Sequence, residues 1–390
     1  MLKEVKKPVL FVSHFANMSG APLLLLEIIK EFKKRSDVPF EILVVEDGEI
    51  SGEFEKLAKT YIWHKKQRVL PQGILKIPVQ FWRRLSLKLH HLTILNSVKN
   101  TSLVFFNTIT NGQVQKKLLP LKCRFVCYVH ELEAAIQIAT NKEGLEIVLA
   151  NTQLFLACSH AVKKNLVTNH HIEEKNIEVV NYSMAEVFRE KKMHAAFITA
   201  FKTNNNIPAD AIIIGIAASN EWRKGFDLLL PLVAVFFNLY PHSNAYFIWK
   251  GFRKENRSSF FDLYDYMKFN NKGRVILLPH DGDSINTIAC FDIHLLLSRE
   301  DPYPLVVLEA ASFAIPTVSF ANAGGSPEFI EKDCGCCAPY GDLLRLSQLL
   351  YELANDAEKR NNMGANAQRK LRQRHDPENA MPAFMRILAS

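Results

Sequence analysis

Short apolar runs alternate with amphipathic stretches along this chain, and they do so in two separate series. Several of the runs are continuously apolar, which is typical of strands covered by helices on both faces. The first series predicts strands at Val9–Ser13, Ile42–Val45, Leu103–Phe106, Phe125–His130 and Phe155–Ser159. The second predicts strands at Ala211–Ala218, Ala245–Trp249, Val275–Leu278, Asp292–Leu297 and Pro316–Phe320. Strands that alternate with helices indicate parallel, doubly wound sheets, so we expect an α/β chain with two such domains.

The helices between these strands follow from apolar spacing. After the first strand, the loop Ser19-Gly20-Ala21-Pro22 leads into apolar residues at helical intervals, namely Leu25, Ile28, Ile29 and Phe32. Further helices are expected at about 225–240 and 304–313. We expect a first domain over residues 1–190, a second over 191–370, and a C-terminal helix over 371–390 that packs back towards the first domain. The join should lie in the polar stretch Arg189–Asn206.

Charge and composition limit the partners and the compartment. The chain has 48 Lys and Arg against 40 Asp and Glu, a formal net charge of +8 that suits a nucleotide, a phospholipid surface or a nucleic acid. No stretch reaches the roughly 18 apolar residues of a membrane span, and no signal-peptide core follows the first lysines. Seven cysteines, an odd number, fit a reducing compartment. We therefore expect a cytoplasmic protein.

The polar residues that could carry chemistry stand where the predicted strands end. In open α/β sheets, ligands bind beyond the carboxyl ends of the strands. If the two sheets face each other, six such loops line one cleft: Ser13-His14, His130-Glu131, Ser159, residues 219–225, residues 298–301 and residues 322–325.

Two of these loops have a composition that suits a nucleotide sugar. Trp222-Arg223-Lys224-Gly225 places two cations before a predicted helix, an arrangement that suits a diphosphate, although a solvated loop has the same composition. Asp301 lies in a strand-to-helix loop, and Glu309 follows on an otherwise apolar helix. A carboxylate there is costly unless it accepts hydrogen bonds, and sugar or ribose hydroxyls are suitable donors; an internal cap or ion pair is the alternative.

These motifs resemble the GT-B glycosyltransferases of family GT4, the retaining "group 1" enzymes. Members carry an acidic residue, seven intervening residues and a glutamate, and Asp301 and Glu309 have that spacing. The usual first residue is glutamate, so Asp301 departs from the pattern and Glu300 is a possible substitute. Gly324-Gly325-Ser326-Pro327-Glu328 is similar to the family's glycine-rich turn. Ser219 stands where many members have an arginine, so Arg223 is the alternative second phosphate contact.

The resemblance implies a fold and a role for each matching residue. The fold would be GT-B, two Rossmann-like domains facing each other across a cleft. Lys224 with Arg223 would neutralise the diphosphate, Asp301 would contact the donor sugar, and Glu309 would bind the ribose. Gly324 and Gly325 would let backbone N–H groups approach the sugar or phosphate, and Gly20 would bring a first-domain loop close to the diphosphate. His14 and His130 look like acceptor-side residues, with His130 at the reaction centre; a histidine that ends a strand can equally be structural.

The reaction implied is transfer of a sugar from a UDP-sugar or GDP-sugar to a hydroxyl of a saccharide or glycolipid, with retention, in bacterial surface polysaccharide or lipopolysaccharide synthesis. No cofactor and no metal are expected, and Asp281-Gly282-Asp283 is interpreted as a turn. The alternatives are a GT-B epimerase or hydrolase that needs no acceptor, and a non-catalytic protein that binds sugar nucleotides.

Two weaker features remain. Residues 64–100 contain eight Lys and Arg and no acidic residue, with Phe81, Trp82 and several leucines interleaved. A basic amphipathic helix of this kind can lie on an anionic membrane, or can pack in the domain with its charges in water. Cys334, Cys336 and Cys337 lack the paired spacing of a zinc site and are interpreted as small residues in a turn. No motif supports nucleic-acid binding.

Overall fold

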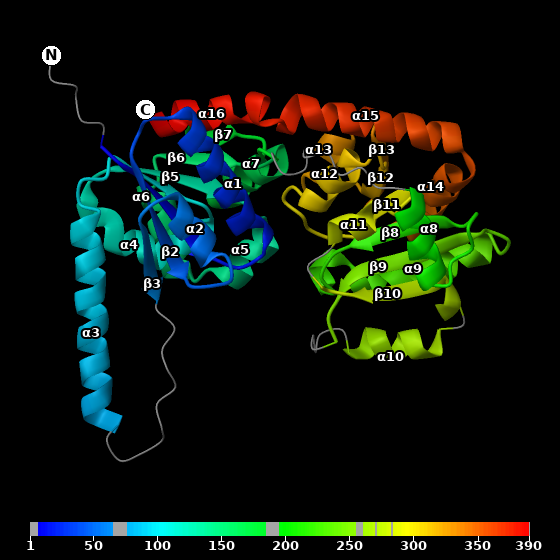
Figure 1. Cartoon of the computed structure of the whole chain (residues 1–390), viewed down its shortest axis with the longest axis horizontal. Helices are drawn as coiled ribbons and strands as arrows, with labels where there is room; N and C mark the ends of the chain where they lie inside the picture. The colour runs from blue at the N-terminus through cyan, green and yellow to red at the C-terminus, as the bar shows by residue number, and fades with distance from the viewer. Residues whose placement is uncertain are drawn as a thin grey trace. The chain divides into compact units, whose positions relative to one another are not determined.

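The chain divides into two compact units, each built on its own sheet (Figure 1). The computed structural model describes residues 7–64, 76–184, 195–254, 260–269, 271–281 and 284–389. Unit 1 comprises Met1–Cys158, Val162–Ser183 and Pro377–Ser390, and unit 2 comprises Ser159–Ala161 and Met184–Asp376. The change from one unit to the other thus falls at Ser183/Met184, before the polar stretch expected to hold the join. Much of that stretch is the helix α8, Ala195–Asn204.

Unit 1 has a seven-stranded parallel sheet in the order β3-β2-β1-β4-β5-β6-β7. The strands are β1 Val9–Phe15, β2 Phe40–Glu46, β3 Thr60–His64, β4 Leu103–Phe106, β5 Arg124–Val129, β6 Leu154–Ala157 and β7 Ile177–Val179. The helices are α1 Gly20–Arg35, α2 Ser51–Leu57, α3 Lys76–Ser97, α4 Gly112–Leu118, α5 Glu133–Ala139, α6 Lys142–Asn151, α7 His160–His170 and α16 Pro377–Ala389. All five strands expected in the first series are present.

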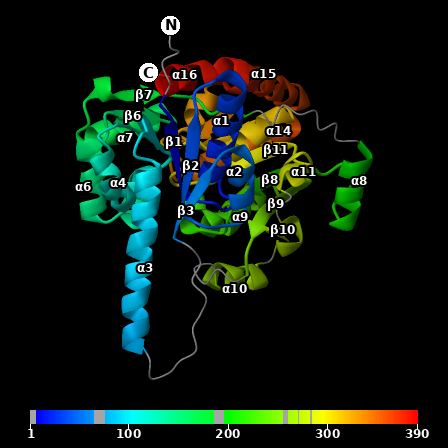
Figure 2. The same ribbon diagram turned by 60° about the vertical axis from the view of Figure 1, so that its left-hand side comes forward.

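The core of unit 1 forms where the apolar faces of its helices meet the sheet. The apolar residues predicted to line one face of α1 are all buried, namely Leu25, Ile28, Ile29 and Phe32. Phe32 packs edge-on against Phe11 of β1, with ring centroids 5.6 Å apart. By contrast, α3 extends beyond the sheet in both views (Figure 1, Figure 2).

Unit 2 has a six-stranded parallel sheet in the order β10-β9-β8-β11-β12-β13. The strands are β8 Ile212–Ala217, β9 Ala245–Phe252, β10 Val275–Pro279, β11 Ile293–Leu296, β12 Thr317–Phe320 and β13 Gly335–Ala338. The helices besides α8 are α9 Leu229–Leu239, α10 Phe260–Lys268, α11 Ser284–Ile288, α12 Leu305–Ser312, α13 Ser326–Ile330, α14 Leu343–Asn355 and α15 Ala357–His375. The helix expected from residue 225 begins later, because Gly225 is left-handed at φ 77° and a 3₁₀ turn, Phe226–Leu228, follows it.

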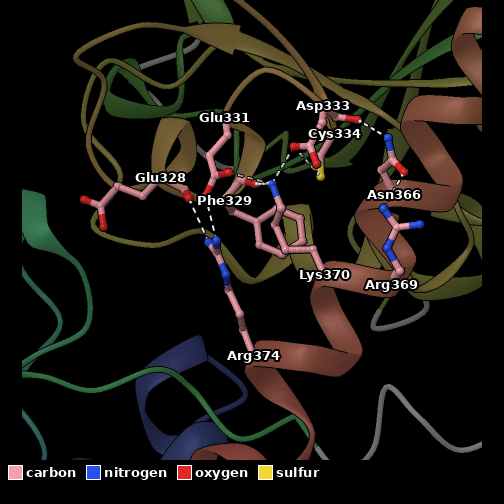
Figure 3. A network of polar contacts seen from close by, with 9 residues as sticks. All are labelled: Glu328, Phe329, Glu331, Asp333, Cys334, Asn366, Arg369, Lys370 and Arg374. Atoms are coloured by element: carbon pink, nitrogen blue, oxygen red, sulfur yellow. Dashed lines mark hydrogen bonds and ion pairs between the residues drawn. The ribbon is translucent and has the colours of Figure 1, made fainter.

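A buried cation fixes α15 against the rest of unit 2 (Figure 3). The Lys370 side chain is 9% exposed, and its Nζ lies 3.1 Å from Glu331 Oε2 and 2.6 Å from Asp333 Oδ1. It also donates to the Phe329 carbonyl at 3.2 Å. The neighbouring Arg374 pairs with Glu331 at 2.6 Å. These bonds tie α15 to α13 and to the segment that leads into β13.

Candidate active site

Both sheets place a pair of polar loops at the point where the strand order reverses. In unit 1 this point lies between β1 and β4, and in unit 2 between β8 and β11. Loops that leave these strands at their carboxyl ends diverge to opposite faces of the sheet and leave a crevice, which is where open α/β sheets bind ligands. The loop after β8 is residues 218–225, and the loop after β11 is residues 297–304. Most of the predicted donor-side residues lie in these two loops.

Lys224 and Asp301 meet at this point of unit 2. Lys224 Nζ lies 2.5 Å from Asp301 Oδ2, and the Ser298 hydroxyl donates to the same oxygen at 3.2 Å. The Asp301 side chain is 6% exposed and that of Lys224 is 19% exposed. A lysine ammonium has three N–H donors, so Lys224 can hold Asp301 and still offer donors to a ligand. The structure thus brings together two of the residues predicted from separate motifs.

Arg223 and Glu300 also lie side by side, although they interact through a backbone group. Arg223 Nη1 donates to the Glu300 carbonyl at 2.9 Å, and the Arg299 N–H donates to the Arg223 carbonyl at 2.8 Å. These bonds fasten the 222–224 turn to the 299–301 loop. Arg223 and the two candidate acids, Glu300 and Asp301, therefore lie in two segments that are hydrogen-bonded to each other.

Arg299 belongs to this cluster and was not predicted from the sequence. Its guanidinium holds Asp227 by two bonds of 2.7 Å, donates to the Trp222 carbonyl at 2.6 Å and lies 4.6 Å from the Trp222 ring centroid. The hydrogen bonds that Arg299 donates to the Asp227 carboxylate raise the pKa of Arg299. A sequence signal existed, because Arg299 lies within the Ser298–Asp301 run, but nothing in the run indicates that its partner is Asp227.

The two glycines allow the 323–325 turn to run alongside Asp301. The Asp301 N–H donates to the Ala323 carbonyl at 2.7 Å, and the Gly325 N–H donates to the Asp301 carbonyl at 2.9 Å. Gly324 has a φ of 120°, and a Cβ on Gly325 would stand 2.1 Å from the Pro302 carbonyl oxygen. The Gly325 N–H, expected to face a sugar or phosphate, is therefore bonded to the Asp301 loop. The glycines bring two loops together, and Asp301 lies between them.

Glu309 and Ser219 lie on the elements that border this cluster. Glu309 is half-buried in the second turn of α12, whose neighbouring residues Leu308 and Ala310 are buried. Ser219 is half-buried, and its carbonyl accepts from the Glu221 N–H at 2.9 Å. Asn220, the next residue, is buried and fixes this loop by exchanging two bonds with the backbone of Arg253, at 2.9 and 3.0 Å.

In unit 1, His130 is held in one tautomer by its neighbours. Asn107 Nδ2 donates to the Ala21 carbonyl at 2.7 Å, so its Oδ1 faces His130 Nε2, 3.1 Å away. His130 Nε2 must then carry the proton, and Nδ1 accepts from the Tyr182 hydroxyl at 3.1 Å. Burial lowers the pKa of His130 to about 3. The ring is neutral near pH 7, and both of its nitrogens are hydrogen-bonded within the chain, an arrangement that a structural histidine would also have.

His14 and Gly20 lie at the ends of neighbouring elements of the same unit. His14, in β1, has its Nδ1 2.9 Å from Asn111 Oδ1. Gly20 is the first residue of α1 and adjoins Ala21, the residue bonded by Asn107. The three residues predicted for the acceptor side thus lie at the carboxyl ends of β1 and β5 and at the start of α1.

The remaining candidates lie elsewhere or are not described. Asp281 accepts two bonds of 2.6 Å from Lys250, while residues 282 and 283 lie outside the described residues. Within the described part of the chain, no group of three or more His, Cys, Asp or Glu side chains could hold a metal ion, and no helix combines the length and the hydropathy of a membrane span. Gly335–Ala338, with Cys336 and Cys337, is strand β13 and not a turn.

The chain matches one family model and several curated sequences. Residues 184–370 match the family described as "Glycosyl transferases group 1". An N-acetyl-alpha-D-glucosaminyl L-malate synthase from Bacillus anthracis is 29% identical over 115 residues, 29% of this chain and 30% of the relative. A GDP-mannose-dependent monoacylated alpha-(1-6)-phosphatidylinositol monomannoside mannosyltransferase from Corynebacterium glutamicum is 28% identical over 151 residues, 37% of this chain and 38% of the relative. The chain spans about a third of the length of the curated relatives that it matches.

Solved structures match the fold over nearly the whole chain. Anabaena HepE in complex with UDP-glucose has a TM-score of 0.79 at 17% identity, with 98% of this chain and 100% of that chain covered. WaaG, a glycosyltransferase involved in lipopolysaccharide biosynthesis, has a TM-score of 0.68 at 13% identity, with 98% and 100% covered. At these identities the likeness concerns the fold alone.

Proposed function

We propose that this chain, a GT-B protein whose residues 184–370 belong to the group 1 glycosyl transferases, transfers a sugar from a nucleoside diphosphate sugar to a hydroxyl of a saccharide or glycolipid. The family and the fold are those expected from the sequence. The observation that carries the proposal is the Lys224–Asp301 pair at the switch point of the unit 2 sheet. It places a cation and an acid side by side where such sheets bind ligands.

The donor side follows from the charges in unit 2. Lys224 and Arg223 bind the diphosphate and stabilise the negative charge that develops on it as the bond to the sugar breaks. Asp301 orients Lys224 and accepts hydrogen bonds from the donor sugar, and Glu309 accepts from the ribose hydroxyls. HepE is described with UDP-glucose and the Corynebacterium relative as GDP-mannose-dependent, so UDP- and GDP-sugars are the candidate donors. Retention and independence of metal are part of the proposal and come from the family resemblance.

The acceptor side lies in unit 1, at His14, Gly20 and His130. Because both nitrogens of His130 are bonded, a sugar hydroxyl reaches this ring only by replacing Tyr182 or Asn107 as its partner. WaaG is involved in lipopolysaccharide biosynthesis, which supports an acceptor in bacterial surface polysaccharide synthesis.

A peripheral membrane contact through residues 64–100 is also proposed. In the described part of α3, Leu85, Leu89 and Leu92 are exposed by 37%, 57% and 60% and recur along one face of the helix. Leucines on one face of a helix rich in Lys and Arg suit an anionic lipid surface. The protein should sediment with anionic liposomes but not with neutral ones, and equal behaviour with both would exclude the contact.

A thermal-shift panel of UDP-, GDP- and ADP-sugars tests the function. A ligand present at 100 times its dissociation constant adds about 2.7 kcal/mol of stability, which is readily measured. The donor that stabilises the protein is then supplied with and without saccharide acceptors. Sugar transfer that requires an acceptor supports the proposal. Free sugar or a sugar isomer formed at the full rate without acceptor would indicate a hydrolase or epimerase, and binding without turnover a non-catalytic protein.

A further inference from the structure

A single carboxylate at the end of β5 is bonded to the loop that follows β4. Glu131 Oε1 accepts from the Thr108 hydroxyl, while Oε2 accepts from the His130 N–H at 3.0 Å and, at a longer 3.5 Å, from the Ile109 N–H. Thr108 is buried, and Glu131 is half-buried. The two strands are neighbours in the sheet, and the bonds that Glu131 accepts from Thr108 and Ile109 join the loops that follow them. We refer to these bonds as the clasp.

The same loop carries the groups that hold His130. Thr108 directly follows Asn107, whose amide bonds both His130 Nε2 and the Ala21 carbonyl. The Thr108 hydroxyl, having donated to Glu131, accepts from the Thr110 N–H at 3.1 Å and caps the 3₁₀ turn Ile109–Asn111. Asn111, the last residue of that turn, contacts His14. The conformation of the loop therefore sets the positions of Asn107, His14 and His130 together.

We propose that Glu131 is a positioning residue of the acceptor-side site: its carboxylate clasps Thr108 and so holds Asn107 and His130 in the geometry that sugar transfer needs. This inference rests on the proposed function. Only a carboxylate accepts from Thr108 on one oxygen and from the N–H groups on the other. A glutamine in its place has one acceptor oxygen, and its NH₂ group faces either the Thr108 hydroxyl or the His130 N–H.

The surroundings of Glu131 make the clasp sensitive to pH. Burial raises the pKa of Glu131 to about 6, against the three hydrogen bonds that favour its charged form. The titratable groups that face it in the described structure are His130, whose pKa is lowered to about 3, and Cys127, whose pKa burial raises well above its usual range. Both are neutral between pH 5 and 8. Glu131 is therefore the group of this cluster whose charge changes over that pH range. The charged form is lost as the pH falls through about 6.

The test compares Glu131→Gln, Thr108→Val and Thr108→Ser with the full-length wild type, using the donor identified by the panel. We expect Glu131→Gln and Thr108→Val to lower kcat about tenfold, since small misplacements at a reaction centre have effects of this order or larger. The Kd for the free nucleoside diphosphate should change less than about twofold. The double variant Glu131→Gln/Thr108→Val should be no slower than the slower of the two single variants, because both substitutions remove the same Thr108–Glu131 hydrogen bond. Thr108→Ser keeps the hydroxyl and should have a kcat close to that of the wild type. Glu146→Gln, at an exposed glutamate of α6, is the matched control for Glu131→Gln.

The pH profile and amide exchange separate positioning from general destabilisation. Wild-type kcat should fall below about pH 6, and Glu131→Gln should lack that acid limb. The protection of the Ile109, Thr110 and His130 amides against hydrogen exchange, each expressed relative to intrinsic exchange at the same pH, should fall in Glu131→Gln at pH 8 and in the wild type at pH 5. The inference would be overturned if Glu131→Gln had the kcat of the wild type, if its kcat fell below pH 6 as in the wild type, or if its amide protection were unchanged. A wild-type protein that transfers no sugar would overturn the proposed function instead and with it the catalytic part of this inference, while the exchange rates would still report whether the clasp exists.

Discussion

At the scale of single residues, the cation proposed to bind the diphosphate, Lys224, also neutralises a buried acid. Lys224→Ala should lower turnover strongly and should also lower the free energy of unfolding by about 3 kcal/mol, since Asp301 would stay buried without its partner. Urea denaturation and a turnover assay measure the two effects. The double variant with Asp301→Asn should regain most of the stability and none of the activity. A single variant as stable as the wild type would show that the pair does not stabilise unit 2.

His294 makes the stability of unit 2 depend on pH. The residue is fully buried in β11 with Nδ1 3.0 Å from Thr317 Oγ1, and burial lowers its pKa to about 3, against 6.5 for an ordinary histidine. Between these values the unfolded chain binds a proton that the folded chain does not, so stability is present above pH 6.5 and is lost as the pH falls.

Replacing His294 should remove this contribution. His294→Leu should reduce the pH dependence of the unfolding free energy between pH 6.5 and 5 by up to about 1.4 kcal/mol per pH unit, measured by urea denaturation. His242→Gln, at an exposed position, is the control. An equal slope in His294→Leu and the wild type would mean that the pKa of His294 is not lowered by folding.

At the scale of elements, the helix that carries Glu309 packs closely against α15. A Cβ on Gly364 of α15 would stand 1.8 Å from the Ala314 carbonyl oxygen, just beyond the end of α12. Gly→Ala within a helix ordinarily gains up to about 1 kcal/mol, but Gly364→Ala should lower the unfolding free energy by about 1–3 kcal/mol because the helices must separate. The separation should also weaken nucleotide binding.

Thermal unfolding and nucleotide titration of Gly364→Ala measure these effects. Gly52→Ala is the matched control, because Gly52 lies in the helix α2 and a Cβ there meets nothing within 4 Å. That variant should be neutral or more stable. If Gly364→Ala were equally harmless, the close approach of the two helices would be wrong.

Which elements could be predicted from the sequence depended on their apolarity. Continuously apolar strands and the face of α1 follow from the apolar pattern, whereas β3, β7 and β13 were missed because they hold polar or small residues. The loops of the site could be predicted because the apolar runs show where the strands end. Pairings such as Arg299–Asp227 and Thr108–Glu131 were not, since each joins segments far apart in the sequence.

At the scale of the whole molecule, the C-terminal helix completes one unit, while the residues proposed to bind the nucleotide lie in the other. The helix α16 belongs to unit 1, and it buries Ala380, Met381, Phe384, Ile387 and Leu388. Phe384 packs edge-on against Tyr128 of β5 with ring centroids 5.4 Å apart, and Glu378 holds Arg35 of α1 at 2.6 Å. Burying one large apolar side chain contributes about 1.5–3 kcal/mol, so loss of α16 removes several such contributions from unit 1.

Deleting residues 377–390 should therefore destabilise unit 1 by about 5 kcal/mol or more and leave the stability of unit 2 nearly unchanged. Scanning calorimetry should show an early transition for unit 1 and a later one for unit 2. Only the later transition should rise on adding the nucleoside diphosphate at 100 times its Kd, by the equivalent of about 2.7 kcal/mol, since Lys224, Arg223 and Glu309 all lie in unit 2. Loss of this shift in the truncated protein would mean that the nucleotide site needs an intact unit 1, and the assignment of the donor side to unit 2 alone would fail.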